Sequence, residues 1–221
     1  MPRTALIAGA TGLTGQQLLQ QLLSDARYTQ VHALVRKHAF APHAKLDEHI
    51  VEFAALPKLP APLKKVDDVF CCLGTTINIA GSKTAFRAVD FDYVLNLAHA
   101  AKKTGAQRFM VMSSLGANAK SSVFYSRVKG EMEDALRELN FAELHVFQPS
   151  FLIGDRAEAR PGERLGIAAF QIISPLLFGP ARKYRAIEVT DVARAMINAA
   201  WLQRSGVHVY LSDEIQKMAD S

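Results

Sequence analysis

Several features that would point to particular protein classes are scarce in this 221-residue sequence. Its two cysteines, Cys71 and Cys72, are adjacent. Neighbouring residues of a strand point to opposite faces, so a disulfide between these two would be strained. The sequence therefore excludes a disulfide-stapled domain and predicts two reduced, buried thiols in a reducing compartment. A chain of this length can instead be held together by its own apolar core.

Long apolar runs and clusters of one charge are missing as well. The most apolar late segment, residues 167–179, contains Gln171 and Pro175 and is too short to cross a bilayer. No stretch after Met1 has the form of a secretion signal. Lys and Arg total 26 against 21 for Asp and Glu, a formal net charge of +5, but the basic residues are dispersed. We therefore expect a cytoplasmic protein that binds neither membranes nor nucleic acid.

The residues that are present form the ordinary mixture of a globular protein, with 49% apolar and 21% charged residues. The sequence has no internal repeat and no long linker, so we expect one domain over residues 1–221. The seven histidines show no spacing typical of metal ligands, and no metal site is expected.

Short β-branched runs alternate along the chain with longer helical patterns. Several runs are apolar almost throughout, which is typical of strands covered by helices on both faces. This alternation predicts a Rossmann-like, doubly wound α/β fold with a parallel sheet, whose ligands bind at the carboxyl ends of the strands. The expected strands are residues 5–8, 31–35, 50–53, 69–73, 109–113, 144–148 and 207–211, and the expected helices are residues 14–23, 91–103, 126–139 and 191–203.

The alternation stops between residues 151 and 185, a segment rich in glycine and proline. Long irregular segments of compact domains are usually functional, so this small insertion is predicted to close over the substrate side, with plain packing as the alternative. Its apolar residues suggest an apolar substrate or a partner surface, again with core packing as the alternative. They are Phe151, Ile153, Ile167, Phe170, Ile172 and Leu176.

A glycine-rich turn joins the first expected strand to the first expected helix. Gly9 permits a tight turn, Gly12 lets the backbone approach a pyrophosphate, and Gly15 lets helix and strand pack closely. Free N–H groups at the helix start would point at the anion, and the hydroxyl groups of Thr11 and Thr14 can add hydrogen bonds. This turn at the first strand–helix junction predicts a dinucleotide site.

Two cations follow the second expected strand, where NAD enzymes place an acidic residue against the adenosine ribose. Arg36 and Lys37 suit a 2′-phosphate on that ribose, which the planar guanidinium can hold with two hydrogen bonds. We therefore predict NADP(H) rather than NAD(H), with a solvated basic loop as the alternative.

The fourth expected strand runs into a turn of mostly small residues. Leu73, Gly74 and Thr75 lie in this turn, where bulky side chains would collide with a cofactor, and we expect them to contact it. Asp90 follows just ahead of the expected helix at residues 91–103, and its simplest role is to cap that helix.

Tyr125 and Lys129 place a phenol and an ammonium group four residues apart on one helix face. The ammonium group favours the phenolate, so the pair can donate a proton to a carbonyl or accept one from an alcohol. Lys129 can also hold ribose hydroxyls. The strand expected at residues 109–113 runs into two serines, and one hydroxyl can orient a substrate carbonyl. We choose Ser113, with Ser114 as the alternative, because neighbouring strand residues face opposite ways.

Together, the glycine turn, the serine pair and the Tyr/Lys helix resemble those of the short-chain dehydrogenase/reductase superfamily. The GxxGxxG spacing is similar to that of its extended and atypical members. Further motifs resemble the Tat-interacting-protein (metastasis-suppressor) group of the atypical members, and this resemblance covers nearly the whole chain. These motifs are Cys71-Cys-Leu-Gly-Thr-Thr76, Ser113-Ser-Leu-Gly-Ala117, Lys129-Gly-Glu131 and residues 155–163.

The resemblance implies an NADPH-dependent oxidoreductase that transfers hydride to an unidentified carbonyl-like molecule. An NADPH-binding redox-sensing or regulatory protein with little turnover is the alternative. The expected macromolecular partners are a second copy of the chain, in a homodimer, or another protein. Nucleotide-sugar epimerase chemistry is disfavoured, because few residues remain for a sugar-nucleotide domain. The implied cofactor contacts are Thr11, Gly12, Leu13 and Thr14 at the phosphates, Arg36 and Lys37 at the adenosine end, and Leu152 and Arg160 in the closing segment. For Arg160, an ion pair with its acidic neighbours is the alternative.

Overall fold

Seven parallel strands form one sheet in the computed structural model, which describes residues 1–56, 63, 65–154 and 179–221. The second and third strands lie on one side of the first strand, and the later strands lie on its other side. Doubly wound sheets bind ligands at such a switch point. The Rossmann-like prediction is therefore confirmed. In spatial order the strands are β3 (Leu46–Ile50), β2 (Tyr28–Val35), β1 (Arg3–Ala8), β4 (Asp68–Cys71), β5 (Arg108–Met112), β6 (Glu143–Gln148) and β9 (Gly206–Leu211).

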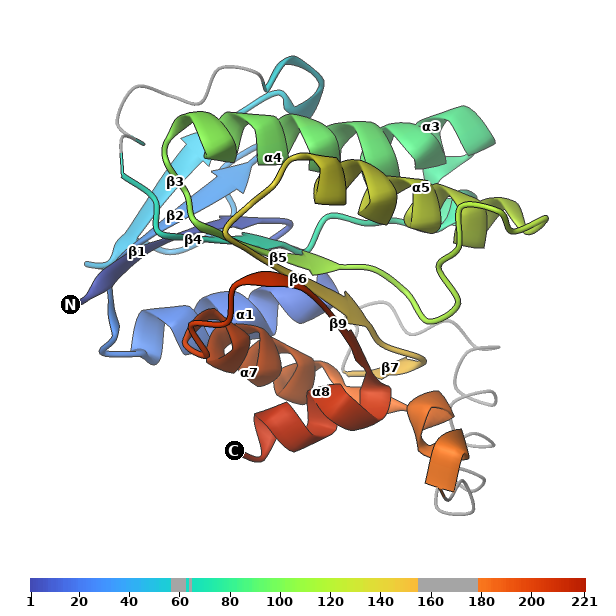
Figure 1. The fold of residues 1–221 in the computed structure, drawn as a ribbon. Coiled ribbons are helices and arrows are strands. Elements are labelled where there is room, and N and C mark those ends of the chain that lie inside the picture. Colours follow the sequence, from blue (N-terminus) through green and yellow to red (C-terminus); the bar gives the residue numbers. More distant parts are fainter. Residues whose placement is uncertain (57–62, 64, 155–178) are drawn as a thin grey trace.

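Helices cover both faces of the sheet (Figure 1). One layer holds α1 (Leu13–Ser24), α7 (Val189–Ala200) and α8 (Ser212–Ala219), and the other holds α4 (Tyr93–Lys103) and α5 (Phe124–Glu138). Alternation along β1 sends Ile7 into the core beneath α1 and α7, and Leu6 into the core beneath α4 and α5. Both side chains are fully buried, as the continuous apolar strands predict.

The strand predicted at residues 50–53 is wrong. The edge strand β3 ends at Ile50, and Phe53–Ala55 form a 3-10 turn, η1. Register explains the difference, because β3 pairs with β2 from Val31 opposite Leu46 onward. The strand reads Leu-Asp-Glu-His-Ile and is half exposed, so it lacks the apolar run that marks a central strand. Phe53 instead stacks on Tyr93 of α4, with ring centroids 6.1 Å apart.

Several short elements beside the carboxyl edge carry no periodic signal and were not predicted. β7 (Leu152–Ile153) pairs in parallel with β8 (Ile187–Glu188), which brings the two ends of the insertion at residues 151–185 together. Within the described ranges, no helix is both long enough and apolar enough to cross a membrane. The remaining short elements are α2 (Ile77–Ala80), α3 (Lys83–Arg87), a π-helical turn η2 (Ala88–Asp92) and η4 (Gly179–Tyr184).

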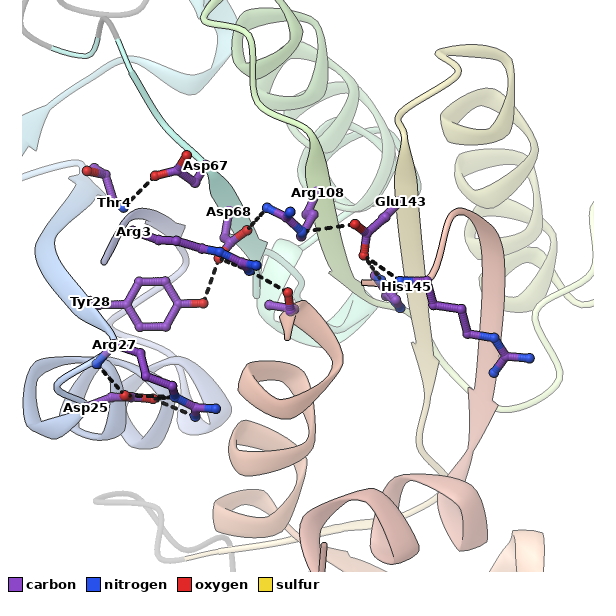
Figure 2. A network of polar contacts seen from close by, with 12 residues as sticks. Arg3, Thr4, Asp25, Arg27, Tyr28, Asp67, Asp68, Arg108, Glu143 and His145 are labelled. Carbon is purple, nitrogen blue, oxygen red and sulfur yellow. Dashed lines mark hydrogen bonds and ion pairs between the residues drawn. The ribbon is translucent and has the colours of Figure 1, made fainter. Parts of the chain in front are cut away.

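Buried charges connect the amino ends of the central strands (Figure 2). The fully buried carboxylate of Asp68 accepts hydrogen bonds from Arg3 Nη1 at 3.2 Å and from Arg108 Nη1 at 3.0 Å. The Tyr28 hydroxyl donates to the same carboxylate at 2.8 Å, and Arg108 Nε donates to Glu143 Oε1 at 3.0 Å. Protein groups therefore satisfy this network at the end of the sheet opposite the predicted ligand site.

Candidate cofactor and catalytic site

The turn between β1 and α1 has a backbone that requires glycine at two positions. Gly9 has φ +83°, and a Cβ atom there would lie 2.5 Å from the carbonyl carbon of Cys72. A Cβ atom at Gly15 would lie 2.1 Å from the carbonyl oxygen of Gly9. The first glycine thus permits the turn and the last permits close packing of helix on strand, as the sequence predicts.

The amino terminus of α1 is built to receive an anion. Gly12 is its N-cap residue and has no side chain to bond the first N–H groups, and the first turn contains no acidic residue. Those N–H groups and the helix dipole therefore favour a phosphate at this end. Thr11 is exposed beside this turn, Leu13 is half buried and Thr14 is buried.

Arg36 and Lys37 follow directly after β2, the neighbour of β1 in the sheet. The register places Leu34 opposite Ala8, so these cations lie next to the start of the glycine turn. Both side chains are exposed, and neither forms an ion pair with the described part of the chain. They are available to a phosphate on the adenosine ribose.

The turn after β4 connects the glycine turn to the helix that carries Lys129. The Cys72 N–H donates to the Ala8 carbonyl at 2.8 Å, which extends the pairing of β1 with β4. Leu73 and Thr75 are half buried, whereas Gly74 is exposed. A Cβ atom at Gly74 would lie 3.7 Å from Lys129 Nζ, so the turn passes beside that ammonium group.

Both cysteines are free, as predicted. Cys71 is buried, whereas Cys72 is only half buried. Burial raises the pKa of the Cys71 thiol to about 12, and burial likewise raises the pKa of Cys72. Neither thiol is therefore a ready nucleophile at neutral pH, and both serve packing at this edge.

Asp90 is a site residue whose role the sequence interpretation missed. It is fully buried within η2, where it does not cap a helix, so the predicted cap is wrong. Its Oδ1 lies 2.7 Å from Lys129 Nζ, and its Oδ2 accepts a hydrogen bond from the Thr75 N–H at 2.9 Å. A signal was present in the sequence, because Asp90 shares the buried helical stripe of Val94 and Leu97.

Lys129 is buried on α5 and remains protonated. Burial alone would lower the pKa of this amine, but the charge of Asp90, with a smaller contribution from Tyr125, outweighs burial and raises it. Tyr125 lies in the first turn of α5, one helical turn before Lys129, with its ring centroid 5.4 Å from that of Phe86. The structure thus brings the predicted phenol and ammonium groups onto one face of α5, with the ammonium group beside Gly74.

Ser113 immediately follows β5, and its hydroxyl bonds within the protein. The buried Ser113 Oγ donates to Glu133 Oε1 at 2.5 Å. Glu133, one turn beyond Lys129, also accepts from Gln148 Nε2 at 2.8 Å. Ser114 is half buried, and strand alternation directs it to the other face of the sheet.

The described end of the closing segment reaches the glycine turn. Leu152 in β7 is half buried and pairs with Ile187 of β8. A Cβ atom at Gly154 would lie 3.3 Å from Leu13 Cδ1, so β7 ends beside the start of α1. Arg160 lies outside the described residues, as do Ile167, Phe170, Ile172 and Leu176.

A doubly wound sheet with this glycine turn and this Tyr/Lys helix defines a nucleotide-binding protein of the Rossmann type. Residues 9–152 match the family model described as NAD(P)H-binding, and the chain belongs to that family.

Known relatives show which group within this family the chain resembles. Protein HTATIP2 of Rattus norvegicus is 39% identical over 199 residues, covering 89% of this chain and 80% of that protein. "Protein FMP52, mitochondrial" of Coccidioides immitis (strain RS) is 31% identical over 212 residues, covering 89% and 85%. The resemblance to the Tat-interacting-protein group is therefore confirmed. Among solved structures, the Bordetella bronchiseptica enzyme WbmH in complex with NAD+ superposes with a TM-score of 0.70 at 18% identity, covering 100% of this chain and 80% of that one, which shows the shared fold.

Proposed function

We propose that this protein is an NADP(H)-dependent oxidoreductase of the atypical short-chain type that reduces a carbonyl-like small molecule. The observation that carries the proposal is the position of the Lys129–Asp90 pair. Asp90 accepts a hydrogen bond from the N–H of Thr75, next to Gly74, and Lys129 lies one helical turn from Tyr125. A dinucleotide held by the α1 terminus would end beside this phenol and ammonium group. When bound, the nicotinamide supplies the hydride chemistry.

The chain's own residues supply proton transfer and orientation. Tyr125 donates a proton to the substrate oxygen, and Lys129 keeps a positive charge near the phenol and holds ribose hydroxyls. Ser113 orients the carbonyl, and since its hydrogen is donated to Glu133 it would first have to release that bond; Ser114 remains the alternative. Turnover of Ser113→Ala and Ser114→Ala distinguishes them, because the serine in contact with substrate is the one whose loss lowers kcat.

Replacing Tyr125 tests the reductase directly. The purified full chain is incubated with NADPH and a panel of aliphatic and aromatic aldehydes and ketones, and loss of nicotinamide absorbance is followed. Tyr125→Phe is expected to lower turnover by roughly a hundredfold to ten-thousandfold while NADPH affinity stays nearly unchanged. Tyr93→Phe, on α4, is the matched control and keeps wild-type turnover. An active Tyr125→Phe enzyme would overturn the proposed proton donor.

One observation favours a second function, an NADPH-binding regulatory protein with little turnover. The Asp90 carboxylate lies 2.7 Å from Lys129 Nζ and offsets part of the charge that would stabilise a phenolate at Tyr125. Absence of turnover across the panel, together with intact NADPH binding, would support this function and contradict the reductase.

We also propose a location and a ligand class for this protein in the cell. A cytoplasmic protein that binds a small apolar molecule, and neither nucleic acid nor membrane, fits the dispersed charge. Fractionation of cells expressing the full chain tests the compartment, and recovery in the mitochondrial fraction would contradict it. Sedimentation of the purified chain with and without NADPH tests for a homodimer.

A further inference from the structure

Two histidines and an aspartate meet at the edge of the sheet, away from the residues of the proposed function. His32 lies in β2, and Asp47 and His49 lie in the edge strand β3. The parallel register pairs His32 with Asp47, and His49, two residues further along, points to the same face. Sequence spacing does not predict this cluster, because it forms only when the two strands pair.

The distances within the cluster suit one small cation. His32 Nδ1 lies 3.0 Å from His49 Nε2 and 3.6 Å from Asp47 Oδ2, and all three ligand atoms lie within 4.8 Å of one another. Two ligands on a tetrahedral zinc ion, with bonds of about 2.0–2.1 Å, are roughly 3.4 Å apart. The three atoms can therefore converge on one ion with small side-chain rotations.

The surroundings orient one ligand of the cluster and leave the cluster open to solvent. Gln30 Nε2 donates to Asp47 Oδ2 at 2.9 Å and orients the carboxylate. The His32 side chain is 10% exposed and that of Asp47 58%, so a cation can arrive from solvent at Asp47.

We propose that His32, Asp47 and His49 form a binding site for one divalent transition-metal ion, with zinc as its best match. Nitrogen and carboxylate ligands in this number are typical of zinc, with water completing the coordination. The ion would cross-link the edge strand β3 to β2, the two strands that flank the loop carrying Arg36 and Lys37. A hydrogen bond between the imidazoles is the alternative reason for their proximity.

Metal titration of the tag-free, chelator-treated full chain tests the site. Calorimetry with ZnCl₂ is expected to show one saturable site of micromolar or tighter Kd. Titration with Co²⁺ is expected to produce the visible absorption bands of a tetrahedral ion. Asp47→Asn and His49→Ala should each weaken zinc binding at least tenfold and abolish the rise in Tm that zinc gives the wild type.

The matched control is His38→Ala. His38 is exposed and pairs with Glu48 Oε2 at 2.8 Å, next to the cluster but outside it, so its loss should leave zinc affinity unchanged. Circular dichroism confirms that each variant is folded. Absence of saturable binding at millimolar zinc, or binding that His49→Ala leaves intact, would overturn the site. NADPH affinity of the same variants stays unchanged, which separates this result from the proposed function.

Discussion

The two ends of the sheet treat polar groups in opposite ways. At the amino ends, the buried carboxylate of Asp68 receives hydrogen bonds from Arg3, Tyr28 and Arg108 (Figure 2). At the carboxyl ends, the first turn of α1 has no side-chain cap, and the Arg36 and Lys37 side chains are exposed. A network satisfied by the protein itself stabilises the fold, whereas a helix terminus without a side-chain cap and two exposed cations beside one turn favour an anionic ligand.

The Lys129–Asp90 pair combines both kinds of behaviour. Both side chains are buried, as Asp68 is, yet Asp90 accepts a hydrogen bond from the Thr75 N–H, next to the exposed Gly74. Substitution of Lys129 or Asp90 is therefore expected to change both stability and turnover. Substitutions at the amino end should change stability alone, and those at the carboxyl end should change cofactor binding or turnover.

The largest effect is expected from Lys129→Met. It removes the ammonium group near Tyr125 and leaves the buried Asp90 carboxylate without its cation. Turnover should fall by about a thousandfold or more, and the free energy of unfolding by about 3–5 kcal/mol. Denaturant unfolding and the NADPH absorbance assay measure the two effects. The double variant Lys129→Met/Asp90→Asn should regain much of the stability and none of the turnover; recovery of turnover would show that Lys129 takes no part in the chemistry.

At the amino end, Asp68→Asn should change stability alone. The substitution removes the buried charge that the guanidinium groups of Arg3 (buried) and Arg108 (half buried) share, and about 3–5 kcal/mol of unfolding free energy should be lost. NADPH affinity, measured by fluorescence titration, should remain unchanged. Asp67→Asn is the matched control, because among the described residues the exposed Asp67 side chain accepts one hydrogen bond, from the Thr4 N–H. A Kd for NADPH that rises with Asp68→Asn would break the separation between the two ends.

His145, at the amino end of the sheet, is expected to make stability depend on pH. Burial lowers the pKa of His145 to about 4, although Glu143 opposes the shift. The unfolded chain takes up this proton near pH 6.5 and the folded chain near pH 4, so stability is full above pH 6.5 and falls as the pH drops through this window. The slope contributed by one such group is up to about 1.4 kcal/mol per pH unit.

Denaturant unfolding of His145→Gln between pH 7 and pH 4 measures that contribution. The variant should show a shallower loss of stability than the wild type. His32 and His49, whose pKa values are also lowered, keep part of the slope in place. An equal slope in wild type and His145→Gln would mean that His145 titrates normally in the folded protein.

The features that could be predicted from the sequence are local ones. The strand–helix alternation and the glycine turn depend on neighbouring residues, and both hold in the structure. The cluster of His32, Asp47 and His49 depends on the register of β3, an edge strand with only half-buried and exposed residues, and the strand was expected several residues too late. An error of that kind moves every side chain relative to its neighbours, so no metal site could be predicted.

The smallest effect is expected from the exposed cation after β2. If the guanidinium binds the 2′-phosphate that only NADPH carries, as we propose, Arg36→Ala should weaken NADPH binding roughly tenfold to a hundredfold and leave NADH binding nearly unchanged. The free energy of unfolding should not change, since Arg36 forms no ion pair with the described residues. Fluorescence titration with both cofactors measures the ratio, and Lys45→Ala, whose side chain bonds the Asp25 carbonyl, is the matched control. Equal affinities of the wild type for NADPH and NADH would contradict the NADP(H) preference and leave the two cations as a solvated loop, while the anion site at α1 would stand.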